Sequence, residues 1–125
     1  MSRIRRFVEG EAFAKICAAD EVLRELAFIT ALPAEAVLAA QGTEGVRAEG
    51  EQVLVQGIAD LVLVYPDHLE LLDYKTHRRK TAADFVRAYK PQLDLYALAV
   101  GKRFVPKPVT YKGIYSLELG RLIEV

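Results

Sequence analysis

Two apolar runs on either side of a short turn signal constrain the fold of this chain more than any other feature. Residues 52–65 (QVLVQGIADLVLVY) and 68–76 (HLELLDYKT) are rich in β-branched and apolar side chains, and Pro66-Asp67 separates them. Such runs around a proline-containing turn are typical of the two strands of a β-hairpin. Gly57, inside the first run, indicates a bulge or a point where another segment approaches closely. We therefore predict an antiparallel pair of strands in the middle of the chain.

The segment before this hairpin begins with an amphipathic pattern. A helix is predicted from about residue 5 to residue 19, where apolar positions recur at helical spacing. Residues 21–29 (EVLRELAFI) favour a strand, although their Leu and Ala content also suits a helix. Residues 31–50, rich in Ala, Glu and Gly, favour a short helix followed by a loop.

The segment after the hairpin contains one long helix and two strands. Thr81 is expected to cap a helix from about residue 82 to residue 100, which Pro91 interrupts or kinks and Gly101 stops. Strands are predicted at about residues 109–117 and 121–125. The order of elements predicts a single α/β domain over residues 1–125, with helices that flank a mixed central sheet.

Composition excludes several classes of protein. At 125 residues and 52% hydrophobic, the chain is long enough for one core, and no apolar run reaches the roughly 18 residues of a membrane span. No secretory signal is evident at the N-terminus, so we expect a cytoplasmic protein without a membrane partner. Cys17 is the single cysteine, which excludes an internal disulfide. Its apolar surroundings predict that it is buried as a small hydrophobe.

The zero net charge conceals an uneven distribution. Residues 1–74 carry a net charge of −7, whereas residues 75–112, with 10 Lys/Arg against 2 Asp/Glu, carry +8. A basic stretch of this kind either follows phosphates or simply solvates a helix. Arg78, Arg79 and Lys80 are the densest part of it, and we expect them to bind DNA phosphates.

Two aspartates and a lysine within the hairpin carry the candidate chemistry. With the turn at Pro66-Asp67, Asp60 and Asp73 are expected nearly opposite each other, and Lys75 shares the face of Asp73 because side chains alternate along a strand. Taken alone, the spacing also fits a surface hairpin with a salt bridge. The apolar residues around both aspartates favour a site, because an unpaired buried carboxylate costs several kcal/mol.

A divalent cation would reconcile the two carboxylates. Mg²⁺ or Mn²⁺ takes oxygen ligands, lowers the pKa of a bound water and screens a phosphate. Lys75 would orient the water or offset developing charge, and the Tyr74 backbone carbonyl would be a further metal ligand beside Asp60 and Asp73.

Three ordered motifs resemble a known family. They are GIADLV at residues 57–62, LDYKT at 72–76 and Tyr89…Gln92-Leu93…Tyr96-Ala97. Together they are similar to the RecB-like branch of the PD-(D/E)XK nucleases, and most of all to the C-terminal nuclease domain of AddA-type helicase–nuclease subunits. The sequence RELAF at residues 24–28 and the closing strands also resemble that group.

This resemblance implies a restriction-endonuclease-like core and a bacterial nuclease of DNA repair and recombination, with DNA and a helicase region of the same or an associated chain as partners. It implies that Asp60 and Asp73 bind the metal and that Lys75 is the catalytic lysine. Gln92 and Tyr96 match the QxxxY motif of the family, which contacts the site or the DNA from one face of a helix. Without the resemblance, Tyr89 and Tyr96 would be interpreted as core residues.

Two further positions are possible contributors. Tyr89 is three residues before Gln92 and would share its helical face, and Glu25 is either an additional acidic group or a charge at the edge of a strand. The chain departs from the family pattern in one respect. Many members carry a metal-binding histidine in an upstream helix, and here only His68 and His77 are present, neither at that place.

The missing histidine leaves competing interpretations. The chain is either a fragment of a larger helicase–nuclease, which we favour, or a domain that dispenses with the residue. The leading hypothesis is metal-dependent hydrolysis of DNA. The alternatives are a catalytically inactive module of the same fold that binds nucleic acid or acts as a scaffold, and an interaction domain without a nucleic-acid role, which would leave the buried aspartates unexplained.

Overall fold

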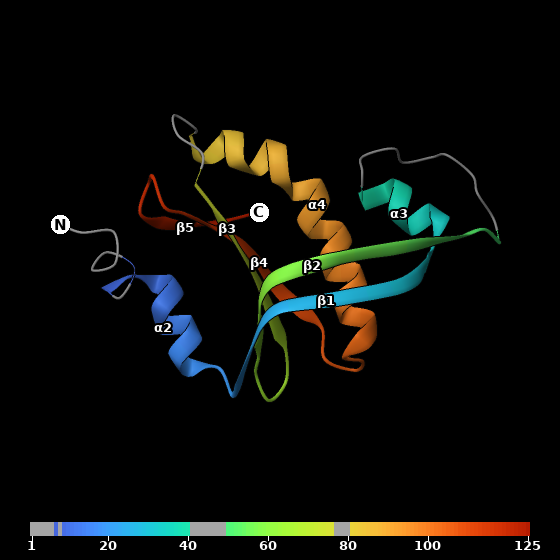
Figure 1. The fold of residues 1–125 in the computed structure, drawn as a ribbon, viewed down its shortest axis with the longest axis horizontal. Coiled ribbons are helices and arrows are strands. Elements are labelled where there is room, and N and C mark those ends of the chain that lie inside the picture. The colour runs from blue at the N-terminus through green and yellow to red at the C-terminus, as the bar shows by residue number, and fades with distance from the viewer. Residues whose placement is uncertain (1–6, 8, 41–49, 77–80) are drawn as a thin grey trace.

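A computed structural model describes residues 7, 9–40, 50–76 and 81–125 of the chain. The described elements follow the predicted order (Figure 1). They are α2 (Glu11–Ala18), β1 (Glu21–Pro33), α3 (Ala34–Ala40), β2 (Gln52–Val64), β3 (Leu69–Lys75), α4 (Ala82–Arg103), β4 (Val109–Ser116) and β5 (Arg121–Glu124). The predicted α/β class, with a mixed sheet flanked by helices, is confirmed. Of the helices in these ranges, none combines the length and apolar character that a bilayer crossing requires.

The five strands form one sheet in the order β1-β2-β3-β4-β5. The β1–β2, β2–β3 and β4–β5 pairs are antiparallel, and the β3–β4 pair is parallel. A parallel neighbour requires a crossover between the strands, and α4 provides it. The predicted hairpin is present, because β2 and β3 pair from Val64↔Leu69 to Leu61↔Leu72 around the turn at Pro66-Asp67.

The sheet has helices on both faces (Figure 1). One face packs against α3 and α4 and forms the main core, to which α4 contributes Phe85, Leu93 and Val100. The other face packs against α2 in a smaller cluster around Leu61, Leu63 and Leu72. We call these the α4 face and the α2 face. Burial of apolar side chains on both faces stabilises the three-layer arrangement.

The α4 helix begins as predicted and ends later. The Thr81 hydroxyl accepts from the backbone N–H of Asp84, and the Asp84 carboxylate accepts from the Thr81 N–H, so the two residues form a capping box. Pro91 lies inside the helix, which bends along its course in Figure 1, as a proline within a helix causes. The prediction that Gly101 stops the helix is wrong.

The helix continues beyond Gly101 because its last turn is held against the sheet. Lys102 Nζ donates to the carbonyl of Ala31, and Arg103 donates to the carbonyl of Ala27, both on the edge strand β1. These bonds satisfy two edge carbonyls that no strand covers within the described sheet. They anchor the end of α4.

Two expectations for the first half of the chain need correction. β1 extends to Pro33, into the segment expected to be helical, because residues 30–33 pair with residues 52–55 of β2. The short helix α3 follows it. Cys17 is exposed, not buried. The helix α2 is short and lies on the surface of the sheet, and it directs the neighbouring Ile16 into the α2 face instead.

β1 and β2 change the face on which they place their apolar side chains. In β2, Ala59 lies in the main core, whereas Leu61, two residues later, lies in the cluster under α2. The side chains of β1 switch in the same way between Leu23 and Leu26. The ladder pairs Arg24↔Leu61 and Leu26↔Ala59 flank the switch, so Glu25 and Asp60 lie opposite each other without forming a ladder pair.

Candidate active site

Asp60 and Asp73 lie opposite each other where β2 and β3 separate. The last ladder pair of these strands is Leu61↔Leu72, and the next residue on each strand is an aspartate. The two carboxyl groups are hydrogen-bonded to each other. Because the ladder ends here, the backbone N–H of Tyr74 is free to donate to Asp60 Oδ2, at 3.0 Å. The separation of the strands thus creates an oxygen-rich notch in the sheet.

The pKa values of the two carboxyl groups are shifted in opposite directions. Burial raises the pKa of Asp73, the hydrogen bond with Asp60 adds to this effect, and the pKa reaches about 6 despite the neighbouring Lys75. Burial also raises the pKa of Asp60, but hydrogen bonds from Asp73 and the Tyr74 N–H, together with the charge of Lys75, outweigh it and lower the pKa. Asp73 is therefore the carboxyl group of the pair that takes up a proton first, as the pH falls toward about 6.

Lys75 stands beside the carboxyl pair. Its Nζ lies 2.9 Å from Asp73 Oδ2, and the two side chains are 21% and 13% exposed. The same Nζ lies 4.4 Å from the ring centroid of Tyr89, in the cation–π arrangement. Tyr89 reaches it from α4. Lys75 is therefore held from two sides on the α4 face of the sheet, beside Asp73.

The donor set fits a hard divalent cation. Among the described residues no group of three or more His, Cys, Asp or Glu side chains gathers closely enough to hold a metal by itself. Mg²⁺ nevertheless binds through one or two carboxylates and retains waters and substrate phosphates as its other ligands. Burial and the neighbouring Asp60 carboxyl group raise the pKa of Asp73, and a cation would offset the negative charge of the pair.

The backbone carbonyl of Tyr74 lies on the side of β3 that faces Asp60, where it would add an oxygen donor to the two carboxyl groups. The Lys75 carbonyl accepts from the Leu117 N–H, at 3.0 Å, so the polar groups of Lys75 point toward β4. In a strand the polar groups of the next residue point the opposite way. The N–H of Tyr74 indeed points toward β2, where it meets Asp60, and its carbonyl shares that side.

The two motif residues of α4 lie in different environments. Tyr96 packs edge-on against Phe28, with ring centroids 5.0 Å apart, and its ring covers Gly57 of β2. A Cβ at residue 57 would lie 2.8 Å from the Tyr96 hydroxyl oxygen, so the close approach predicted for this glycine is confirmed. Gln92, one turn earlier, is exposed. Tyr96 thus packs on the sheet three residues from Asp60.

Glu25 is exposed on β1, opposite Asp60 in the register. Its φ of 49° is in the left-handed region, which is unusual for a residue other than glycine and is enriched at functional sites. Glu25 and Asp60 line the same pocket, but Glu25 does not complete a three-carboxylate group with the aspartates in the described part of the chain.

The remaining predicted residues are not near this notch or are not described. Arg78, Arg79, Lys80 and His77 lie outside the described residues. His68 stacks on Tyr65 beside the hairpin turn, with ring centroids 4.4 Å apart.

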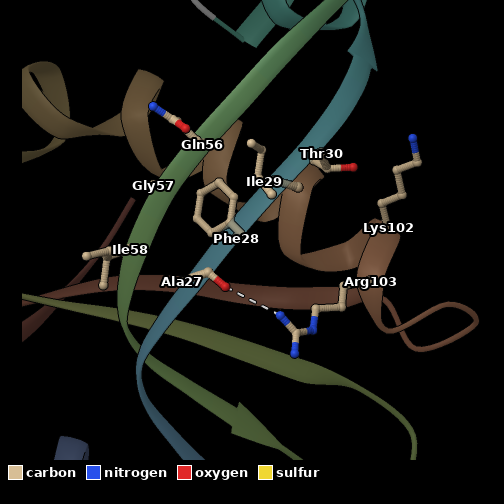
Figure 2. A pocket seen from close by; sticks show the side chains of 10 residues that line it. Ala27, Phe28, Ile29, Thr30, Gln56, Gly57, Ile58, Lys102 and Arg103 are labelled. Atoms are coloured by element: carbon tan, nitrogen blue, oxygen red, sulfur yellow. Dashed lines mark hydrogen bonds between the residues drawn. The ribbon is translucent and has the colours of Figure 1, made fainter.

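Two hollows adjoin the β1–β2 pair. One, of about 580 Å³, reaches Asp60 and is lined by aromatic side chains and Arg24. The sequence interpretation missed its aromatic residues Phe7 and Phe13, which it assigned only to a helix. The larger hollow, of about 910 Å³, lies at the edge of β1 near Lys102 and Arg103, as Figure 2 shows, and none of the aspartate–lysine set lines it.

A mixed sheet with two aspartates and a lysine at the point where two strands separate is the arrangement expected of a PD-(D/E)XK core. The chain belongs to the PD-(D/E)XK nuclease superfamily, which it matches over residues 2–120. The resemblance drawn from the motifs is confirmed.

Several relatives are named as subunits of an ATP-dependent helicase/nuclease. That of Ligilactobacillus salivarius is 37% identical over 105 residues, which cover 83% of this chain and 8% of the relative. The proteins of Heliobacterium modesticaldum and Pelotomaculum thermopropionicum are 34% and 36% identical, and each alignment covers 94% of this chain. The chain spans 8% and 9% of the length of these two relatives.

Proposed function

We propose that this chain hydrolyses phosphodiester bonds of DNA with a divalent cation, Mg²⁺ or Mn²⁺, held by Asp60 and Asp73. The observation that carries the proposal is the hydrogen-bonded carboxyl pair beside Lys75, at the point where β2 and β3 separate. Burying two carboxylates together is unfavourable unless a cation offsets their charge. Membership of a nuclease superfamily supports the same conclusion.

In the proposed mechanism, both aspartates and the Tyr74 carbonyl would hold the cation, with Asp73 in its ionised form. The bound cation supplies an activated water and positive charge at the scissile phosphate. Lys75 orients the attacking water or offsets the charge that develops on the phosphate in the transition state. The ring of Tyr89 would keep the ammonium group of Lys75 in place when Asp73 binds the cation in place of Lys75.

Other residues of the proposed site act on the DNA. Gln92 is exposed on α4, and its amide is proposed to hydrogen-bond to a phosphate or a base. Tyr96 sets the distance between α4 and β2 through its contact with Gly57. Glu25 faces Asp60 across the strands and is an additional acidic candidate. The basic residues Arg78, Arg79 and Lys80 directly follow the lysine motif and are proposed to bind the DNA backbone.

We also propose that the chain works as the nuclease module of a larger protein of DNA repair and recombination, together with a helicase region. The names of the relatives and the small share of their length that the chain covers support this role. The upstream histidine of the family would then be supplied, where it is needed, by sequence outside these 125 residues.

The test is cleavage of labelled single- and double-stranded DNA with Mg²⁺, Mn²⁺ or EDTA. We expect cleavage that requires the cation and is lost in Asp73→Asn. Asp67→Asn is the matched control, because the Asp67 side chain is 86% exposed at the hairpin turn, and it should cleave like the parent.

Other outcomes have defined meanings. If no DNA is cut but the cation still raises the melting temperature of the parent and not of Asp73→Asn, the metal site is present and hydrolysis by this chain alone is refuted. DNA binding with neither cleavage nor a cation effect would instead favour the catalytically inactive binding module.

A further inference from the structure

The pocket of about 580 Å³ opens on the α2 face, opposite the face that holds Lys75. It lies between α2 and the point where β1 and β2 change faces. Its volume is in the range of small-molecule sites, roughly 300–1,000 Å³. Asp60 forms part of its wall, so the pocket borders the notch that holds the carboxyl pair.

Aromatic rings form much of the pocket wall. Phe7 lies 6.3 Å from Tyr74 and 6.0 Å from Phe13, measured between ring centroids. Tyr74 is 38% exposed, which leaves a large part of a ring open to solvent beside the candidate active site. Exposed rings next to a groove are the platforms on which single-stranded nucleic acids stack their bases.

The position of Tyr74 links this ring to the chemistry. Tyr74 lies between Asp73 and Lys75 on β3, so strand alternation sends its side chain to the opposite face while its N–H binds Asp60. The ring therefore lies on the same strand as Asp73, and the Tyr74 N–H joins that strand to Asp60. When the phosphate of a nucleotide lies at the notch, the base of that nucleotide or of the next one is close enough to enter the pocket.

Two charged residues besides Asp60 line the pocket with the rings. Arg24 lies close enough to Tyr74 for its charge to act on the phenol, whose pKa burial raises and Arg24 lowers. An arginine here suits a phosphate next to the scissile one, and Glu25 offers an acceptor for the amino groups of a base. The left-handed conformation of Glu25 accompanies the switch of faces that opens the pocket.

We propose that the pocket binds one unstacked nucleobase of the DNA strand that is being cut, with the exposed ring of Tyr74 as its stacking platform, Phe7 beside that ring at an interplanar angle of 57°, and Arg24 on a flanking phosphate. This inference rests on the proposed function, since it takes DNA as the substrate. It makes single-stranded or frayed DNA the preferred substrate, because the bases inside an intact duplex remain stacked and paired.

The experiment measures the affinity for a single-stranded oligonucleotide in Ca²⁺, with one abasic site moved along the sequence. Loss of a stacked base should weaken binding to the parent about 5- to 100-fold at one position and little elsewhere. In Tyr74→Leu, which keeps an apolar side chain, that position-specific loss should fall below about twofold. Ile29→Ala, which removes an exposed apolar side chain at the other hollow, should keep it.

Each result decides between the two proposals. Binding without a position-specific loss, or a loss that is unchanged in Tyr74→Leu, overturns the base pocket and leaves the nuclease proposal standing. Failure of the intact oligonucleotide to bind with any divalent cation overturns both. If Tyr74→Leu unfolds, Phe7→Leu, which removes the ring beside Tyr74 in the same pocket, makes the comparison instead.

Discussion

Asp60 and Asp73 share a hydrogen bond at the first position where β2 and β3 no longer pair. A ladder bond at this place would have used the Tyr74 N–H, which instead binds Asp60. The interruption of the ladder is thus what allows two carboxyl groups, a backbone N–H and a backbone carbonyl to converge. Protons and cations compete for the oxygen atoms of a notch of this kind.

Proton release should therefore accompany cation binding. The pKa of Asp73 in the metal-free protein is raised to about 6, so below that pH a cation must displace a proton and its affinity should fall. In calorimetric titrations with Mn²⁺ at pH 5.5 and pH 7.5, we expect weaker binding and more released protons at the lower pH. Asp73→Asn should remove both effects, and equal proton release at the two pH values would contradict the assignment.

The same shift predicts the stability of the metal-free protein. A raised pKa in the folded state means that the contribution of Asp73 is fully present below its unfolded pKa, near 3.8, and is lost as the pH rises through about 6. In EDTA, Asp73→Asn should gain stability relative to the parent between pH 5 and pH 7. Urea unfolding across this range measures the gain.

Lys75→Met should separate chemistry from metal binding. The substitution keeps the aliphatic stem but removes the ammonium group 2.9 Å from Asp73. Losing a group that stabilises transition-state charge costs about 100- to 1,000-fold in cleavage rate. The cation-induced rise in melting temperature should persist, because a competing positive charge has been removed. Lys90→Met on the exposed surface of α4 is the control. A variant with normal cleavage and normal melting would refute the role of Lys75.

Gly57→Ala should destabilise the fold, because the added methyl group meets Tyr96 and Phe28 atoms at 2.8–2.9 Å. Such overpacking costs roughly 1–3 kcal/mol in free energy of unfolding. Gly101→Ala is the matched control. Its methyl group would meet only Val109, at 3.8 Å, and it replaces a glycine within α4, so it should stabilise by up to about 1 kcal/mol. Chemical denaturation of both variants tests whether close approach, and not glycine as such, matters at residue 57.

Replacing Arg78, Arg79 and Lys80 together with alanine should lower the salt dependence of DNA binding. Each phosphate contact contributes about 0.7 to 0.9 to the slope of log affinity against log salt. Loss of up to three contacts should therefore reduce the slope by about 2 units. If the parent and the triple variant have the same slope in anisotropy titrations, these residues do not bind the DNA backbone.

The sequence was sufficient to bring Asp60, Asp73 and Lys75 together because a hairpin register follows from its turn. Counting outward from Pro66-Asp67 places the two aspartates opposite each other, and the observed pairing of Leu61 with Leu72 has that register. Alternation along β3 then assigns Lys75 to the face of Asp73. These are local relationships, and the alternation of strands over a few residues determines them.

The change of faces at Glu25 and Asp60 could not be predicted in the same way. It depends on two strands losing alternation at residues that lie opposite each other, and the stretch that follows Asp60, residues 61–65, is apolar at every position. A continuous apolar run does not reveal which residues share a face. Val55, Ala59, Leu61 and Leu63 all have the spacing of one face in the sequence, and only the structure divides them between the α4 face and the α2 face.

The helix boundary that was missed has a tertiary cause. Gly101 resembles a helix stop in sequence, but the two residues that follow it bind the edge of β1 and extend α4. The exposure of Cys17 has a similar origin, because the orientation of α2 on the sheet decides which side of that short helix is buried.

A final prediction concerns the junction between α4 and β4. Asp94 of α4 forms ion pairs with Lys112 of β4 and with Lys90, one turn earlier in α4. Burial raises the pKa of Asp94, but the hydrogen bonds and charges of the two lysines outweigh it and leave the pKa below its usual 3.8. A lowered pKa in the folded state stabilises the protein above the unfolded pKa, and this contribution is lost as the pH falls through the folded value.

Asp94→Asn should therefore lower the free energy of unfolding by roughly 1 kcal/mol near pH 7, and the difference from the parent should vanish in strong acid. Lys112→Met should have a larger effect than Lys90→Met, because only Lys112 joins the crossover helix to the next strand. Urea denaturation between pH 2.5 and pH 7 measures all three variants, and an Asp94→Asn difference that persists unchanged at the acid end would show that the stabilisation does not come from the charge of Asp94.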